Sequence, residues 1–142
     1  MKHKRLLALL LSAVLALGVL AGCSSTDEKG GLRSFSAATL DGGTFSQADI
    51  QEKDLTVINF WGTFCSPCIG EMPYLAAFAK ALPENVRLIT VCVDADGNTE
   101  AAKELLQAAG YEGITLVSGD GDLAALISDI QAVPTTIFVD KK

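Results

Sequence analysis

The sequence predicts an α/β fold built on a mixed or parallel sheet. Residues 55–61 and 86–94 are runs of β-branched, aromatic and aliphatic residues, which are typical of buried strands. Each run is followed by a segment with helical spacing, at 66–82 and 99–109. Strands that alternate with helices form βαβ units, in which helices cover the faces of a shared sheet.

The elements before the first buried strand are expected to be short. Residues 34–50, "SFSAATLDGGTFSQADI", alternate weakly between apolar and polar side chains and break at residues 41–43. This pattern predicts a strand, a turn and a second short element. The run 55–61, "LTVINFW", then predicts the first strand that is buried on both faces.

The next segment is predicted to be a helix over about residues 66–82. Its apolar residues recur at helical spacing, and they are Met72, Leu75, Phe78 and Leu82. Pro73 lies inside this segment, where a kink is possible.

The second half of the chain repeats the alternation. After the strand 86–94, Asn98 is a plausible helix cap and Gly110 a plausible stop for the helix between them. Three further elements are expected from the remaining pattern: a strand in 114–118, a helix in 122–130 and a strand in 135–140.

Residues 1–22 have the layout of a secretory signal and are not counted in the domain. A basic start is followed by an uncharged apolar run, and Leu20-Ala21-Gly22-Cys23 resembles the lipobox of bacterial lipoproteins. We therefore expect a lipidated Cys23, a flexible tether over 23–34 and a domain over 35–142. An uncleaved membrane helix, or a plain signal with an incidental Cys23, are the alternatives.

Charge and composition exclude several classes of function. Loss of three basic residues with the signal leaves 8 basic against 17 acidic residues, a net charge of −9. Such a domain would be repelled by nucleic acid. The only histidine, His3, is lost as well. Without histidine, Cys-His and Ser-His nucleophile pairs are excluded, and most zinc sites are unfavourable.

The segment 61–73, "WGTFCSPCIGEMP", contains two cysteines at a spacing that serves metal binding, a structural disulfide or redox exchange. A zinc site needs four ligands, and the only other thiol of the expected domain is Cys92, inside an apolar run. A disulfide across two residues closes a tiny loop and removes little unfolded-state entropy. Both of these alternatives are therefore weak.

Redox exchange explains the surroundings of the pair. If the helix begins near Cys65, its unpaired N–H groups favour a thiolate there, which can attack a substrate disulfide. Cys68 lies one turn further along, in position to attack Cys65 and release the reduced substrate. Pro67 fits the first helical turn, where the missing N–H has no intrahelical partner to lose.

The segment "NFWGTFCSPCIGEMP" resembles the active site of the thioredoxin superfamily, and especially of TlpA/ResA-type thiol–disulfide oxidoreductases. The motif F-W-x-x-[WF]-C-x-P-C-x-x-E-x-P is matched by Phe60, Trp61, Phe64, Cys65, Pro67, Cys68, Glu71 and Pro73. With "TLDGGTFSQADI" and "AVPTTIFVD", the resemblance extends over about residues 35–140. It implies a thioredoxin-like three-layer α/β/α fold.

The resemblance also implies further site residues. Glu71 matches a glutamate that assists proton transfer at Cys68; a solvated acid at the helix start is the alternative. Pro134 matches a cis-proline, which lets the backbone at Val133 pair with substrate. Trp61 is expected to flank the site and bind substrate, or else to fill the core.

No cofactor and no metal are expected. Residues 119–124 fit a dinucleotide fingerprint superficially, but Asp120 and Asp122 would place negative charge where a pyrophosphate binds.

The sequence stops after 135–140, where the resemblance implies another strand and a C-terminal helix. We therefore expect a truncated domain with an unpaired sheet edge and exposed apolar surface.

The expected function is that of a monomeric, lipid-anchored extracytoplasmic thiol–disulfide oxidoreductase of the bacterial membrane. It would reduce disulfides of exported proteins and be recharged by a membrane electron-donor protein. A disulfide-forming oxidase and a non-catalytic binding lipoprotein are the alternatives.

Overall fold

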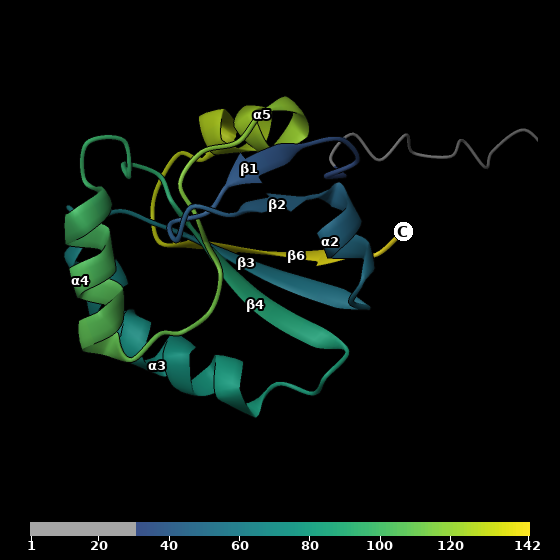
Figure 1. Cartoon of the computed structure of the whole chain (residues 1–142). Helices are drawn as coiled ribbons and strands as arrows, with labels where there is room; N and C mark the ends of the chain where they lie inside the picture. The colour runs from purple at the N-terminus through teal and green to yellow at the C-terminus, as the bar shows by residue number, and fades with distance from the viewer. Residues whose placement is uncertain (1–30) are drawn as a thin grey trace, which may run out of the picture. The chain divides into compact units, whose positions relative to one another are not determined.

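The computed structural model describes residues 31–142 (Figure 1). The predicted signal 1–22, Cys23 and the tether up to residue 30 lie outside the described residues. Within residues 31–142, no helix combines the length and apolar character needed to cross a membrane.

A four-stranded mixed sheet forms the centre of the fold, in the order β5-β4-β3-β6. β3 pairs in parallel with β4 and antiparallel with β6, and β4 pairs in parallel with β5. The strands are β3 Leu55–Trp61, β4 Val86–Cys92, β5 Thr115–Leu116 and β6 Thr135–Asp140. The predicted α/β fold with a mixed sheet is confirmed, and the two long runs of the sequence form its two central strands.

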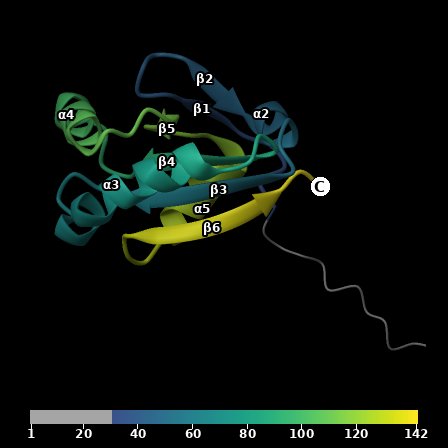
Figure 2. The ribbon, with the colours of Figure 1, turned by 90° about the horizontal axis from the view of Figure 1, so that it is seen from below.

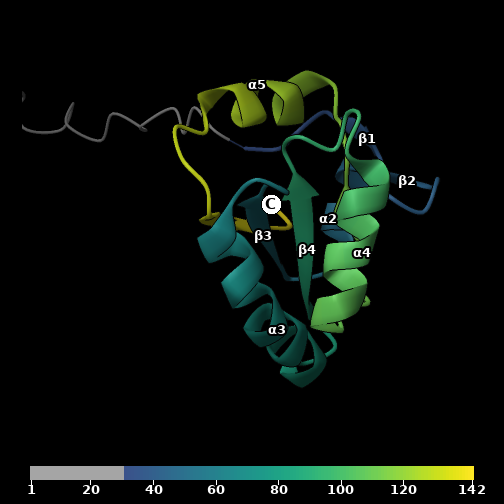
Figure 3. The same cartoon turned by 90° about the vertical axis from the view of Figure 1, so that its left-hand side faces the viewer.

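Both faces of the sheet are covered, which gives three layers. One face packs against α3 (Ser66–Ala81) and α4 (Thr99–Ala109), as Figure 3 shows. The other face packs against α5 (Gly121–Asp129) and the small β1-β2 unit. Figure 2 shows α3 and α5 on opposite sides of β3 and β4. Two apolar clusters, one on each face, therefore form the core, as expected for strands buried on both sides.

The helices that cover the first face begin and end close to the predicted limits. α3 runs from Ser66 to Ala81 and continues through Pro73. α4 follows Asn98, although the Asn98 side chain forms no capping hydrogen bond. α4 ends at Gly110, which has φ +69° and leaves the helix in the left-handed conformation that glycine tolerates.

The N-terminal unit contains the predicted strand and turn, and a helix that the sequence pattern did not indicate. β1 (Ser36–Ala38) and β2 (Thr44–Ser46) pair antiparallel. α2 (Gln47–Gln51) follows at once, because the backbone N–H and the hydroxyl of Ser46 both donate to Asp49, at 2.7 and 2.8 Å. A capping arrangement of this kind stabilises a first turn even when the helix is too short to show periodicity.

The predicted tether over 23–34 is wrong for its last residues. Leu32 is buried in the cluster beneath α5. The backbone N–H groups of Arg33 and Ser34 both donate to the Asp122 carboxylate, at 2.8 Å each. The ordered domain thus begins before residue 35, because a buried leucine and an acidic side chain at the start of α5 hold this segment.

The outer strand β6 bears a large apolar side chain that is mostly exposed. Phe138 lies opposite Val57 of β3 and is 68% exposed. Exposed apolar surface was expected on the sheet, and Phe138 is such a side chain.

Candidate active site

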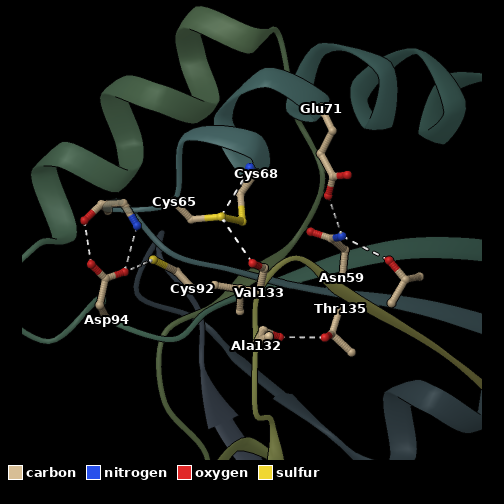
Figure 4. Close-up of a disulfide and its surroundings, with 11 residues drawn as sticks. Asn59, Cys65, Cys68, Glu71, Cys92, Asp94, Ala132, Val133 and Thr135 are labelled. Carbon is tan, nitrogen blue, oxygen red and sulfur yellow. Dashed lines mark hydrogen bonds between the residues drawn. A yellow bond between two sulfur atoms is a disulfide. The ribbon is translucent and has the colours of Figure 1, made fainter.

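A disulfide joins Cys65 and Cys68 at the start of α3 (Figure 4). Cys65 is the N-cap of the helix, and the backbone N–H of Cys68 donates to the Cys65 sulfur at 3.3 Å. Pro67 lies in the first turn. The pairing expected from the CxxC spacing is thus present, with Cys65 where the helix N-terminus favours a thiolate.

The two sulfurs differ in their surroundings. Cys65 is 5% exposed, whereas Cys68 is fully buried. The Cys65 sulfur lies 3.6 Å from the carbonyl oxygen of Val133. The Val133–Pro134 peptide bond is cis, and Pro134 is exposed at the surface. The loop before β6 therefore lies beside Cys65, and Cys65 is the more exposed of the two cysteines.

Glu71 lies one turn after Cys68 on α3 and is half-buried. Its Oε1 atom accepts a hydrogen bond from Nδ2 of Asn59 at 3.1 Å. The same nitrogen lies 3.1 Å from the Thr136 hydroxyl on β6. Glu71 thus accepts a hydrogen bond from a buried amide of β3. A freely solvated acid at the start of a helix would have no such partner.

Asp94, just after β4, anchors the loop that leads into Cys65. It accepts hydrogen bonds from the backbone N–H of Thr63, at 2.9 Å, and from the Thr63 hydroxyl. Burial alone would raise the pKa of Asp94, but these bonds and one from Cys92 outweigh it and hold the pKa below its ordinary value of 3.8. The carboxylate is therefore ionised at neutral pH, and the anchor weakens only as the pH falls through that lowered pKa.

Cys92 is the third cysteine near the site, but it is 1% exposed. Burial raises the pKa of the Cys92 thiol to about 12, and the neighbouring Asp94 carboxylate adds to the rise. An un-ionised and inaccessible thiol is a poor nucleophile.

We therefore expect Cys92 to resist alkylation in the folded protein. After reduction, iodoacetamide at about pH 8 should label Cys65 but leave Cys92 unmodified until a denaturant is added. Mass spectrometry of the two peptides measures both sites in one sample. Labelling of Cys92 at the rate of an exposed thiol would contradict its assignment to the core.

Trp61 was expected either to bind substrate or to fill the core, and its burial is that of a core residue. Its side chain is fully buried and packs in the cluster that contains Cys65 and Cys68. The strand is covered on both faces, so its last residue faces the core under the disulfide instead of a docked substrate. Phe64, which precedes Cys65, is 69% exposed and is the aromatic side chain of the motif that reaches the surface.

Within residues 31–142, no group of three His, Cys, Asp or Glu side chains is placed to hold a metal ion.

Comparisons with known proteins agree with the site. The Redoxin family matches residues 27–142. Thiol-disulfide oxidoreductase ResA of Bacillus cereus is 28% identical and covers 99% of this chain and 85% of its own length.

Two solved structures share the fold. The structure of MTB DsbF in its mixed oxidized and reduced forms has a TM-score of 0.64 and 27% identity, covering 78% of this chain and 79% of that chain. A secreted Mycobacterium tuberculosis disulfide oxidoreductase, homologous to E. coli DsbE, has a TM-score of 0.60 and 26% identity. That match covers 75% of this chain and 83% of the other.

The mixed sheet, with a CxxC disulfide at the start of the helix after its central strand, defines a thioredoxin-like thiol–disulfide oxidoreductase. Within that class, the chain belongs to the Redoxin family and is of the TlpA/ResA type.

Proposed function

We propose that the protein reduces disulfides of exported proteins outside the cytoplasm, with Cys65 as the attacking and Cys68 as the resolving cysteine. The observation that carries the assignment of the two cysteines is the difference in their surroundings. Cys65 lies at the helix N-terminus beside the Val133 loop, and Cys68 is buried behind it. The signal layout of residues 1–22 and the secreted relative support the location.

The exchange proceeds in two balanced steps. The Cys65 thiolate attacks one sulfur of the substrate disulfide, so that a mixed disulfide forms and the other substrate sulfur leaves as a thiolate. Cys68 then loses its proton and attacks the Cys65 sulfur. This second step restores the Cys65–Cys68 disulfide and releases the second substrate thiol. Two electrons pass from the protein to the substrate, and a membrane dithiol donor returns them.

The loop at Val133 and Pro134 is the proposed substrate-binding edge. Val133 is half-buried beside Cys65, and Pro134 is exposed. An extended substrate segment could pair with the backbone at Val133 and so place its disulfide over Cys65. One copy contains both cysteines, so we propose that the protein acts as a monomer.

Glu71 is proposed to take the proton from Cys68 in the second step. We expect Glu71→Gln to slow release of the mixed disulfide by about 10²-fold, since an uncharged amide cannot accept that proton. Rapid mixing of the reduced protein with a disulfide peptide, followed by acid quench, would measure accumulation of the mixed disulfide.

Glu104→Gln is the matched control for this prediction. It removes the same charge from an exposed position of α4, away from the disulfide. Equal release rates in the Glu71 and Glu104 variants would remove Glu71 from the proposed mechanism.

Expression of the full chain in a bacterial host tests the location of the protein and the direction of electron transfer together. We expect the protein in the membrane fraction, lost from it on Cys23→Ala, and accessible to protease from outside the cytoplasmic membrane. Acid trapping and alkylation should find the Cys65–Cys68 pair mostly reduced in cells. A mostly oxidised pair would favour the disulfide-forming oxidase instead, and a cytoplasmic protein would contradict the proposal.

A further inference from the structure

Asn59 is a polar residue inside the core beneath the disulfide. It is 1% exposed and lies in the middle of β3. Its neighbours on the same face of the strand, Val57 and Trp61, pack in the cluster that contains Cys65 and Cys68. A buried amide destabilises the folded protein unless its nitrogen and oxygen form hydrogen bonds. The partners of these two atoms therefore matter for stability.

The amide nitrogen of Asn59 has a hydrogen-bond acceptor for each of its two hydrogens. It donates to Glu71 Oε1 and lies equally close, at 3.1 Å, to the Thr136 hydroxyl. This fixes the orientation of the amide, because the reversed orientation would place its oxygen against the Glu71 carboxylate.

The amide oxygen of Asn59 has no partner among the described residues, although it is buried. Figure 4 shows it on the side of the amide nearer to the Cys65–Cys68 disulfide, while the nitrogen lies on the side of Thr136. The sulfurs of a disulfide carry no hydrogen, so in the oxidised protein they cannot donate to this acceptor. Reduction creates a thiol on Cys68, on the same side of the sheet.

We propose that Asn59 is a positioning residue whose oxygen accepts a hydrogen bond from the Cys68 thiol when the disulfide is reduced. Two electrons from a dithiol donor break the S–S bond. One proton then stays on Cys68, while Cys65 is the thiolate that accepts the Cys68 backbone N–H. The bond would keep Cys68 protonated until its turn to attack, and Glu71, bonded to the same amide, is next to receive the proton. This last step rests on the role proposed above for Glu71.

The inference predicts that Asn59 stabilises the reduced protein relative to the oxidised one. In Asn59→Leu both forms lose the hydrogen bonds of the Asn59 nitrogen to Glu71 and Thr136. Only the reduced form also loses an acceptor for the Cys68 thiol. We expect the thiol–disulfide equilibrium with glutathione to shift by up to about tenfold toward the disulfide. A tenfold shift corresponds to about 1.4 kcal/mol, near the upper end of what one hydrogen bond contributes. Asn59→Val is a second, smaller variant that suits a strand.

Thr136→Val is the matched control. This substitution removes the other contact of the Asn59 nitrogen and leaves the Asn59 oxygen unchanged. The thiol–disulfide equilibrium of the variant with glutathione should therefore stay within about twofold of that of the parent protein. Mass spectrometry after acid quench and alkylation gives the oxidised fraction of the Cys65–Cys68 peptide. Circular dichroism of each oxidised variant shows which variants fold, and only these are compared.

A second readout uses the unaltered protein and so does not depend on a variant folding. The side-chain carbonyl resonance of Asn59 in carbon-13 NMR should move on reduction, since the oxygen gains a donor. The proposal requires both changes. An equilibrium within twofold of the parent in a folded Asn59 variant, or an unmoved carbonyl resonance, overturns it. Neither readout uses an exported substrate or a cell. The test therefore remains valid even if the protein oxidises its substrates or lies in another compartment.

Discussion

Replacement of Cys65 by serine is expected to reduce disulfide exchange to the uncatalysed background, whereas replacement of Cys68 by serine should trap substrate on Cys65. The difference follows from the geometry. The Cys65 sulfur is beside the Val133 loop and accepts the Cys68 N–H, while Cys68 is fully buried. Without Cys68 the first attack still occurs, but no resolving thiol remains. Non-reducing mass spectrometry after mixing with a disulfide peptide would show the covalent complex.

Cys92→Ser is the control for these two variants, because it removes a thiol that is buried and un-ionised. Its exchange activity should equal that of the parent protein. Unaltered function of the Cys65→Ser variant would instead favour the non-catalytic binding lipoprotein, whose cysteines would be idle. A complex trapped on Cys68 in the Cys65→Ser variant would reverse the proposed roles.

Trp61→Ala is expected to lower the free energy of unfolding by about 3–5 kcal/mol, a large share of the 5–15 kcal/mol typical of a domain. Trp61 is fully buried among the side chains beneath the disulfide, and truncation leaves a cavity that the neighbouring strands cannot fill. Urea unfolding of the oxidised protein would measure the loss from the shift of the midpoint.

Trp61→Phe separates the core role from a substrate contact. The smaller ring keeps most of the apolar contacts, so we expect a partial loss of stability and an unchanged KM for a disulfide peptide. A raised KM with an unchanged urea midpoint would show that Trp61 binds substrate after all. Phe64→Ala is a useful comparison, since that side chain is exposed and its loss should leave the midpoint within about 0.5 kcal/mol.

The order of elements was readable from the sequence because local signals agreed with tertiary packing. The run 55–61 is apolar or β-branched at nearly every position, as a strand covered on both faces requires. Pro67 and Gly110 mark helix limits through their own backbone preferences. The CxxC pair could be assigned to redox exchange because its place at a strand-to-helix junction follows from these same signals.

Contacts between distant residues could not be read in this way. The bond between Asn59 and Glu71 depends on how α3 packs over β3, and the bond between Thr63 and Asp94 joins residues 31 positions apart. The same reason left both alternatives open for Trp61. When both faces of a strand are buried, alternation disappears, and the sequence cannot distinguish a core side chain from one at the rim of the site.

The reduction potential of the Cys65–Cys68 pair tests the central claim most directly. The protein would be equilibrated in glutathione or dithiothreitol buffers, and the oxidised fraction of the peptide that carries both cysteines would be measured at each buffer ratio. We predict a single two-electron couple at or below about −250 mV, in the range of thioredoxin-like reductants. A value near about −120 mV, typical of a strong oxidant, or the absence of a defined couple would contradict the account.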